Sequence, residues 1–212
     1  MAERSSSSSR RGGVFITVLA LLLALVPGAL SSAAQAYTPP SNDIQFELEG
    51  CDFYNGLTLP IDFGGTIGSR YACPQNEYTH GNLGKGWNEL DLVPFRMTTH
   101  NKVNQSSTFN VIIAADYVID NTTGYDFISV PTIFRQSSQG CTVSSGNLIE
   151  TDKITGGEDK ALYRVLTVTV PANGDCQIEW YNQLGIGSSK VPGSSLQAYM
   201  FEGEDFGNPG TL

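Results

Sequence analysis

The sequence predicts an all-β protein, a β-sandwich of the immunoglobulin-like or transthyretin-like kind with two disulfides. Three observations predict this class: short segments alternate apolar and polar residues, turn-forming residues separate them, and four cysteines follow an export-type N-terminus. Alternation with a period of two places one face of a strand in a core and the other in water. About seven to nine such segments, rich in Val, Ile, Thr and aromatic residues, are typical of a sandwich.

The N-terminal segment has the composition of a signal peptide. A basic start is followed by an apolar run over 14–30, and Ala34-Gln35-Ala36 offers the small residues that a signal peptidase reads. The alternative is a membrane anchor, but the run is at the short end of the roughly 17–25 residues that span a bilayer. We therefore expect a signal peptide over 1–36 and a single β-sandwich domain with short flexible ends over 37–212. Arg10-Arg11 leaves twin-arginine export open as a weaker alternative.

The charge of the chain restricts its partners. Removing the signal peptide takes away one acidic and three basic residues and changes the formal net charge from −9 to −11. A surface this acidic repels phosphate backbones and anionic lipid. We therefore expect no nucleic-acid partner, no membrane insertion after signal cleavage, and a protein that is secreted, extracellular or associated with the cell surface.

The cysteines have the pattern of a disulfide framework. Cys51, Cys73, Cys141 and Cys176 form no C-x-x-C pair, which argues against a zinc ribbon or a redox motif. An even number in an exported chain predicts two disulfides. Of the three possible connectivities we favour Cys51–Cys73 and Cys141–Cys176. Each closes a loop of a few tens of residues, for which the chain-entropy model gives about 3–4 kcal/mol of stabilisation.

The first half of the mature chain contains four predicted strands. Residues 44–49 alternate cleanly between apolar and polar. Residues 88–97 form the next strand, and Pro94 within it predicts an edge position or a bulge, because proline donates no backbone hydrogen bond. Residues 109–119 and 125–134 are separated by an Asp-Asn-Thr-Thr-Gly turn and together predict a hairpin.

The second half contains the remaining predicted strands. Residues 162–170 alternate over most of their length and end at a Pro-Ala-Asn-Gly turn. Residues 176–184 and 196–201 follow, and we expect them to form the final pair of strands. The sequence thus predicts strands along most of the domain and no helix.

Two features of the sequence suggest catalysis at first sight, but neither of them supports it. Gly185-Ile186-Gly187-Ser188-Ser189-Lys190 resembles a phosphate loop but has neither the required spacing nor a following helix, so it predicts a connecting loop. His80 and His100 lie in polar stretches that predict loops, and we interpret both as surface residues. Two histidines without a third ligand also make no metal site.

Glu179 is the strongest candidate for a catalytic acid. Glycosidase chemistry needs two facing carboxylates, and Glu179 could pair with Glu89 or Asp91. The period of two, however, places Cys176 and Trp180 on the buried face of their strand and Glu179 on the opposite, solvated face. A hydrated carboxylate has no reason for a perturbed pKa. We therefore expect no catalytic residue and no enzyme.

Ligand contacts are better supported than catalysis. Exposed aromatic side chains stack on sugars and on protein partners, and the candidates are Trp87, Tyr181 and Tyr199. We expect no cofactor and no metal; the oxygen-bearing residues near one acidic turn are weak calcium candidates. These candidates are Asp116, Asp120, Asn121 and Asp126.

A resemblance to a known class of proteins rests on the leader, the cysteine spacing and two segments of the chain. The segments 86-GWNELDLVPFRM-97 and 163-YRVLTVTVPANGDCQIEWYNQLGIGS-188 resemble the β-rich N-terminal module of secreted, adhesin-like surface proteins of actinobacteria. The resemblance implies a noncatalytic extracellular module with a structural or adhesive role, and a host or cell-envelope protein or glycan as partner. The alternatives are a glycan-binding module or, with less support, a small secreted hydrolase.

Overall fold

The computed structural model describes residues 43–53, 73–84, 86–134, 137–155, 157–191, 196–203 and 206. All of them belong to the unit Ala36–Leu212. The predicted signal peptide over 1–36 and the ends of the predicted domain lie outside the described residues. The described part contains twelve strands and two short 3-10 turns, η1 (Gln75–Glu77) and η2 (Ser188–Lys190).

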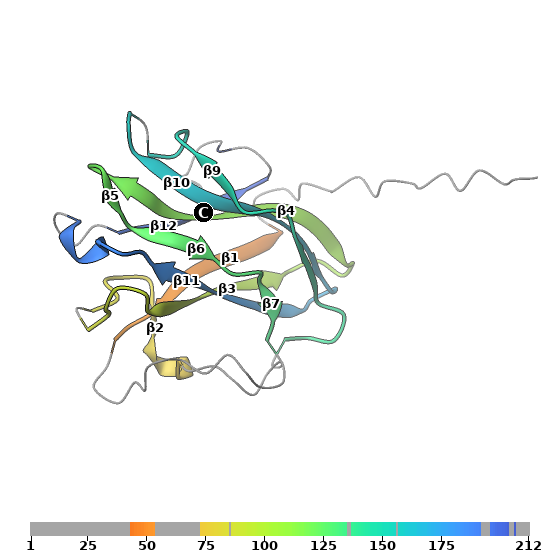
Figure 1. Cartoon of the computed structure of the whole chain (residues 1–212). Coiled ribbons are helices and arrows are strands. Elements are labelled where there is room, and N and C mark those ends of the chain that lie inside the picture. Colours follow the sequence, from red (N-terminus) through yellow and green to blue (C-terminus); the bar gives the residue numbers. More distant parts are fainter. Residues whose placement is uncertain are drawn as a thin grey trace, which may run out of the picture. The chain divides into compact units, whose positions relative to one another are not determined.

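The strands form two antiparallel sheets, which Figure 1 shows as two layers. The first sheet has the order β2-β1-β3-β11-β6, with β7 pairing β11 beside β6. Its strands are β1 (Ile44–Cys51), β2 (Tyr78–Thr79), β3 (Leu92–Asn101), β6 (Tyr125–Ile128), β7 (Thr132–Ile133) and β11 (Asp175–Leu184).

The second sheet has the order β12-β4-β10-β8, with β5 pairing β4 and β9 pairing β10. Its strands are β4 (Ser107–Ile119), β5 (Thr122–Thr123), β8 (Thr142–Ser145), β9 (Ile149–Thr151), β10 (Lys160–Val170) and β12 (Ala198–Glu202). Within the described residues, no helix has the length and hydrophobicity to cross a membrane.

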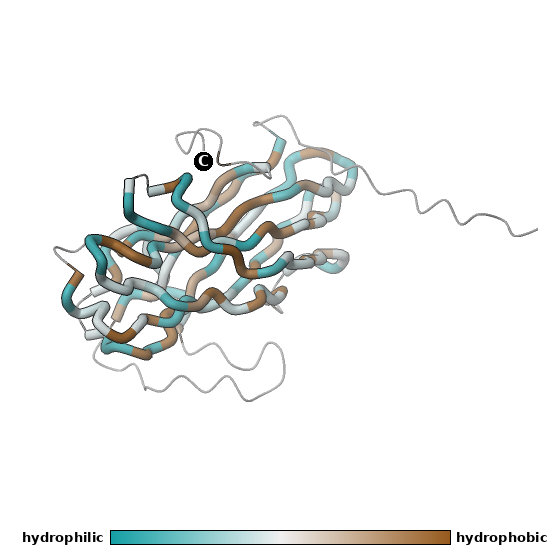
Figure 2. Tube along the Cα trace, turned by 45° about the horizontal axis from the view of Figure 1, so that its top comes forward, coloured by the Kyte–Doolittle hydropathy of each residue, from teal (hydrophilic) through white to brown (hydrophobic). Residues whose placement is uncertain are grey.

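The core lies between the sheets and takes residues from both. Met97 and Ile178 come from the first sheet, and Val111 and Leu166 from the second; all are fully buried. Hydropathy alternates along the strands (Figure 2), because successive side chains point to opposite faces. The predicted all-β class is confirmed. The immunoglobulin-like or transthyretin-like connectivity stays a prediction.

The predicted hairpin of 109–119 with 125–134 is wrong, and so is the predicted pairing of 176–184 with 196–201. After β4 the chain pairs briefly through β5 and then crosses to the first sheet, where β6 pairs with β11. Gly124 lies at this crossing, and a Cβ atom there would come within 2.8 Å of the Asp116 carbonyl oxygen. The last two strands, β11 and β12, also belong to different sheets. Alternation predicts which face of a strand is buried, but it does not identify the strand's partner.

Pro94 lies on an interior strand, not on an edge strand. β3 lies between β1 and β11. The pairing of β1 with β3 ends at Gly50 and Phe95, so Pro94 is one residue beyond the last paired position. Proline is tolerated there because β1 requires no amide hydrogen at that position. The prediction of an edge strand was therefore wrong for β3 as a whole, although Pro94 itself has a local edge position.

Both disulfides have the predicted pairing. Cys51 bonds to Cys73 and Cys141 to Cys176, each with a Cα–Cα distance of 5.9 Å. The first lies in a small buried cluster with Tyr78. The second joins β11 of the first sheet to the residue that precedes β8 of the second sheet. It therefore links the two layers directly.

Candidate functional site

The side chain of Glu179 is buried, and the prediction that it is solvated was wrong. As predicted, Cys176 and Trp180 pack in the core, and Glu179 lies on the opposite face of β11. Yet only 1% of Glu179 is exposed. Its neighbours in the same row of the sheet, Arg96 on β3 and Glu49 on β1, are buried as well. The outer face of the first sheet is therefore closed to solvent along this row, which a period of two cannot reveal.

Glu179 has no hydrogen bond to its described neighbours in this buried row. The Arg96 guanidinium donates to Glu49 Oε2 (2.5 Å) and to Gln75 Oε1 (2.6 Å), and it lies 4.1 Å from the centre of the Tyr78 ring. In the described part of the chain, neither carboxyl oxygen of Glu179 has a hydrogen-bond partner. Burial raises the pKa of Glu179 to about 8, against the opposing effect of the Arg96 charge. Burial thus favours the neutral, protonated form of Glu179.

The proposed carboxylate partners of Glu179 lie elsewhere. Glu89 accepts a hydrogen bond from the Ser189 hydroxyl (2.6 Å), and this bond is the main reason for its lowered pKa. Asp91 accepts a hydrogen bond from the backbone amide of Asn88 (2.6 Å). Both belong to the loop before β3. The geometry thus gives Glu179 no second carboxylate from this loop for glycosidase chemistry.

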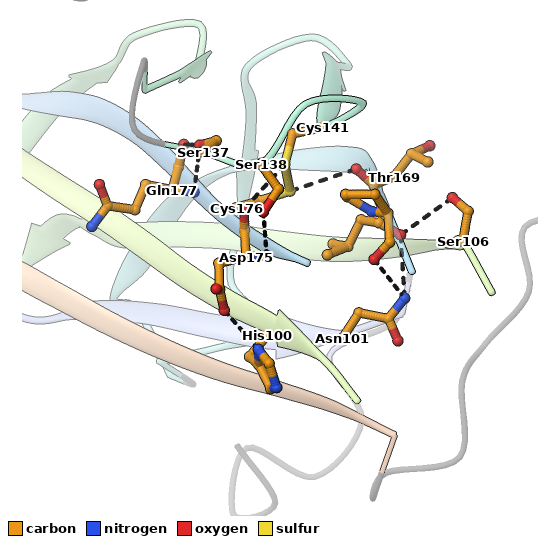
Figure 3. The surroundings of a disulfide bond; sticks show 12 residues. His100, Asn101, Ser106, Ser137, Ser138, Cys141, Thr169, Asp175, Cys176 and Gln177 are labelled. Atoms are coloured by element: carbon orange, nitrogen blue, oxygen red, sulfur yellow. Dashed lines mark hydrogen bonds and ion pairs between the residues drawn. A yellow bond between two sulfur atoms is a disulfide. The ribbon is translucent and has the colours of Figure 1, made fainter. Parts of the chain in front are cut away.

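The two histidines are surface residues, but His100 is not in a loop. It lies on β3, and its Nδ1 is 2.6 Å from Asp175 Oδ1 on β11 (Figure 3). The pair lines a groove of about 350 Å³ on the outer face of the first sheet, together with Glu47 and Gln177. His80 lies in the loop after β2, where its side chain is exposed.

A histidine–carboxylate contact is part of many hydrolytic sites, so its surroundings decide its meaning. The Ser137 hydroxyl is bonded to the backbone of Gln177, and the Ser138 hydroxyl accepts from the amide of Asp175 (Figure 3). Among the described residues, no hydroxyl is hydrogen-bonded to His100. The pair therefore lacks a positioned nucleophile in the described residues.

A cleft of about 950 Å³ opens between the two sheets beside Trp87. Its walls come from β1, β3 and β12 and from the loops that contain Leu83 and Val191. The indole N–H of Trp87 donates to the Leu83 carbonyl (2.8 Å), and its ring packs edge-on against Phe53 at 5.5 Å. Trp87 is thus a half-buried wall residue and not a flat exposed platform.

Tyr181 is half-buried on β11, close to a group of exposed apolar side chains. Leu90, Phe127, Val130 and Ile186 are four of the five large hydrophobic residues with high exposure in the described part. Backbone hydrogen bonds place two of them beside β11, since Phe127 is opposite Gln183 and the Leu90 amide donates to Leu184. Val130 follows Ser129, whose amide donates to Tyr181, and Ile186 is two residues beyond Leu184. We call these four residues the apolar patch.

The apolar patch was not predicted from the sequence. Ile186 lies in the segment Gly185–Lys190, which forms a connecting loop, as predicted; the 3-10 turn at Ser188–Lys190 within it was not predicted. Leu90 has φ of 71°, in the left-handed region that rarely suits a leucine. For Ile186 the signal in the sequence was a large apolar residue within a turn-forming stretch, where no core position is expected. Leu90 gave no such signal, because it lies in the stretch 88–97 that was predicted as a strand, whereas β3 begins at Leu92.

Tyr199 and Asp116 contact each other. The Tyr199 hydroxyl donates to Asp116 Oδ1 (2.8 Å), and the Gln197 amide donates to Oδ2 (2.8 Å). Burial raises the pKa of Asp116 despite these bonds. Both oxygens of Asp116 are therefore engaged within the fold. Tyr199 packs on the outer face of the second sheet, against Phe201 at 6.1 Å.

The calcium candidates do not converge. Asp120 and Asn121 form the tight turn between β4 and β5 with positive φ angles, and Asp126 is exposed on β6. The described residues contain no group of three or more His, Cys, Asp or Glu that could hold a metal ion. Turn formation accounts for Asp120 and Asn121, because both residue types tolerate the left-handed conformation.

Comparisons with known proteins leave the geometry as the sole guide to function. No family model, no curated protein and no solved structure matched the chain.

Proposed function

We propose that the chain is a noncatalytic extracellular surface module with an adhesive role, and that the apolar patch is its contact surface. The observation that carries this proposal is the exposure of Leu90, Phe127, Val130 and Ile186, whose backbone positions all lie close to the end of β11. Soluble proteins rarely gather exposed apolar side chains without a partner that covers them. The two disulfides support an extracellular setting, since such bonds persist in oxidising compartments.

The partner that fits the patch is a host or cell-envelope protein with an apolar surface of its own. A glycan is the alternative, and it depends on Trp87. Stacking on a sugar requires an open aromatic face, whereas Trp87 is half-buried between Phe53 and the cleft. Tyr181, beside the patch, fits a protein contact well, because tyrosine combines an apolar ring with a hydrogen-bonding end.

A matched pair of variants tests the contact surface. The mature chain 37–212 would be added to intact cells and to isolated cell envelopes, and bound protein would be quantified. The double variant Phe127→Ser/Ile186→Ser should bind at least about tenfold more weakly, because it removes two apolar contacts. Ile149→Ser is the control, since Ile149 is also exposed but lies on β9 in the second sheet. Equal binding by both variants would contradict the patch as the contact surface.

A second experiment tests the noncatalytic assignment. The mature chain would be assayed on model glycosides, esters and peptides beside the variants Glu179→Gln and His100→Ala. We expect no turnover by any of the three proteins. Turnover that disappears in His100→Ala or Glu179→Gln, with an unchanged melting temperature, would replace the adhesive assignment with that of a small secreted hydrolase.

A further inference from the structure

The cleft between the sheets has the size of a small-molecule site and lies apart from the groove with His100. Its volume is about 950 Å³, at the upper end of the roughly 300–1,000 Å³ of typical ligand pockets. It is bounded by the inner faces of β1 and β3 on one side and by β12 on the other. β12 is an edge strand of the second sheet, so the cleft opens at the side of the sandwich.

The buried part of the cleft is apolar. Its buried lining comes from the first sheet and from the loop after β11, with two hydroxyl-bearing side chains, Tyr125 and Ser188, in the described residues, and the second sheet contributes half-buried Ala198 of β12. The apolar members of this buried lining are Val93, Phe95, Leu184 and Val191. Half-buried apolar side chains extend the surface toward the rim: Leu48, Leu83, Trp87, Leu196 and Ala198. A ligand group that reaches this buried part meets mainly hydrocarbon there, whereas the exposed part of the lining is polar.

The rim of the cleft is polar and exposed. Asn82, Ser189 and Gln197 are exposed lining residues with uncharged hydrogen-bonding groups. The acidic and basic side chains in the described lining are Glu89 and His80. Glu89 accepts the Ser189 hydrogen bond, and Lys190 lies near enough to lower its pKa. The rim therefore offers hydrogen bonds and little net positive charge.

Two small residues line the cleft, and the space beside the first of them, Gly50, is filled by the Leu83 side chain. At Gly50 on β1 an added Cβ atom would come within 2.7 Å of the Leu83 side chain. Ala198 on β12 packs toward the core, like Met200 two positions later, while Tyr199 between them faces the outside. A larger side chain at Ala198 would therefore enter the cleft from its open edge.

We propose that the cleft binds a single-chain amphiphile, with its alkyl chain between the two sheets and an uncharged, hydroxyl-bearing end at the rim. A sugar alone fits less well, because its hydroxyl groups would lose water along the apolar lining without enough partners in return. An alkyl chain gains from the same burial, by roughly threefold to fourfold in affinity for each methylene group. An anionic end is disfavoured by the acidic chain and by Glu89.

Alkyl maltosides below their critical micelle concentrations are the probes. Calorimetric titration of the mature chain 37–212 should show affinity that rises from octyl to decyl to dodecyl maltoside, by roughly threefold to fourfold for each added methylene. Maltose alone should not bind, and decanoate should bind more weakly than decyl maltoside. Equal affinity for octyl and dodecyl maltoside, or binding of maltose as strong as that of its alkyl derivatives, would overturn the proposal.

Two variants locate the binding site. Ala198→Leu should weaken dodecyl maltoside binding at least about tenfold by filling the cleft, whereas Ala172→Leu, the same change in an exposed turn, should leave it intact. The double variant Phe127→Ser/Ile186→Ser should bind dodecyl maltoside as tightly as the wild type does. This result would separate the cleft from the apolar patch. The cleft would be refuted as the binding site if both leucine variants weakened dodecyl maltoside binding equally, or if the patch variant lost this binding. If Ala198→Leu fails to fold, the chain-length series on the wild type decides.

Discussion

Glu179 and Arg96 are directly opposite each other on β11 and β3, both buried, and no hydrogen bond joins them. Arg96 instead donates to Glu49 and Gln75. One positive charge is therefore shared by two buried carboxyl groups, and burial raises the pKa of the one that has no hydrogen bond within the described residues. The expected consequence is a neutral Glu179 within an otherwise ion-paired row, with the pKa of Glu179 raised to about 8 by burial.

This relationship predicts a pH dependence of stability. Between pH 4.5 and about 8 the unfolded chain releases the Glu179 proton while the folded chain keeps it. The free energy of unfolding should therefore fall as pH rises through this window, by up to about 1.4 kcal/mol per pH unit from this group. Glu179→Gln should remove this contribution and equal or exceed the wild type in stability at pH 8. Urea unfolding of both proteins at several pH values measures this pH dependence of the free energy of unfolding. Parallel curves for the two proteins would contradict a protonated Glu179.

Two fully buried asparagines should respond in opposite ways to replacement by leucine. The Asn101 amide group donates to the carbonyls of Gln105, Val170 and Pro171, whereas in the described structure neither polar atom of Asn182 has a partner. Each unpaired buried polar group costs about 1–3 kcal/mol. Asn182→Leu should thus raise the free energy of unfolding by about 1–3 kcal/mol, and Asn101→Leu should lower it by at least that amount. Denaturant unfolding measures the change in the free energy of unfolding for both variants. A similar loss of stability in the two variants would show that the Asn182 amide has hydrogen-bond partners in the folded protein.

Trp180 should be a major contributor to the core. It is buried, and its ring stacks on that of Phe95 with 6.2 Å between centroids. Trp180→Ala should cost about 3–5 kcal/mol, since it removes a large side chain and leaves a cavity. Ile186→Ala, at a site that is 72% exposed, should change stability by less than about 0.5 kcal/mol. Thermal melting compares the two variants, and a small effect of Trp180→Ala would contradict its place in the core.

Each disulfide should contribute strongly to stability. Cys51–Cys73 spans 22 residues and Cys141–Cys176 spans 35. Replacing either pair by serine should lower the free energy of unfolding by about 3–4 kcal/mol. Melting of both double variants measures this effect, and peptide mapping without reductant checks the pairing. A fragment that joins Cys51 to Cys141 or Cys176 would be inconsistent with the fold.

Processing should release a product that begins at Tyr37. Ala34-Gln35-Ala36 is the best small-x-small site after the apolar run. N-terminal sequencing of the exported protein identifies the cleavage point. Retention of Met1 on a membrane-bound product would instead support the anchor interpretation of the N-terminal segment.

The sequence by itself determined what depends on local pattern and short separations. Alternation placed Trp180 and Cys176 on the buried face of β11, and the spacing of the cysteines favoured the pairing that the structure contains. These features follow from the geometry of a single strand and from the entropy of closing a short loop. Neither requires knowledge of the rest of the chain.

Only the tertiary structure decided which strands pair and which outer faces are covered. β6 and β12 each leave their neighbour in sequence and join the opposite sheet, and the row that contains Glu179 is buried on the face that a period of two assigns to solvent. The cleft beside Trp87 depends on β1, β3, β12 and two loops at once. Strand pairing and burial are long-range properties, because they depend on surfaces that distant segments bring together. No local pattern encodes them.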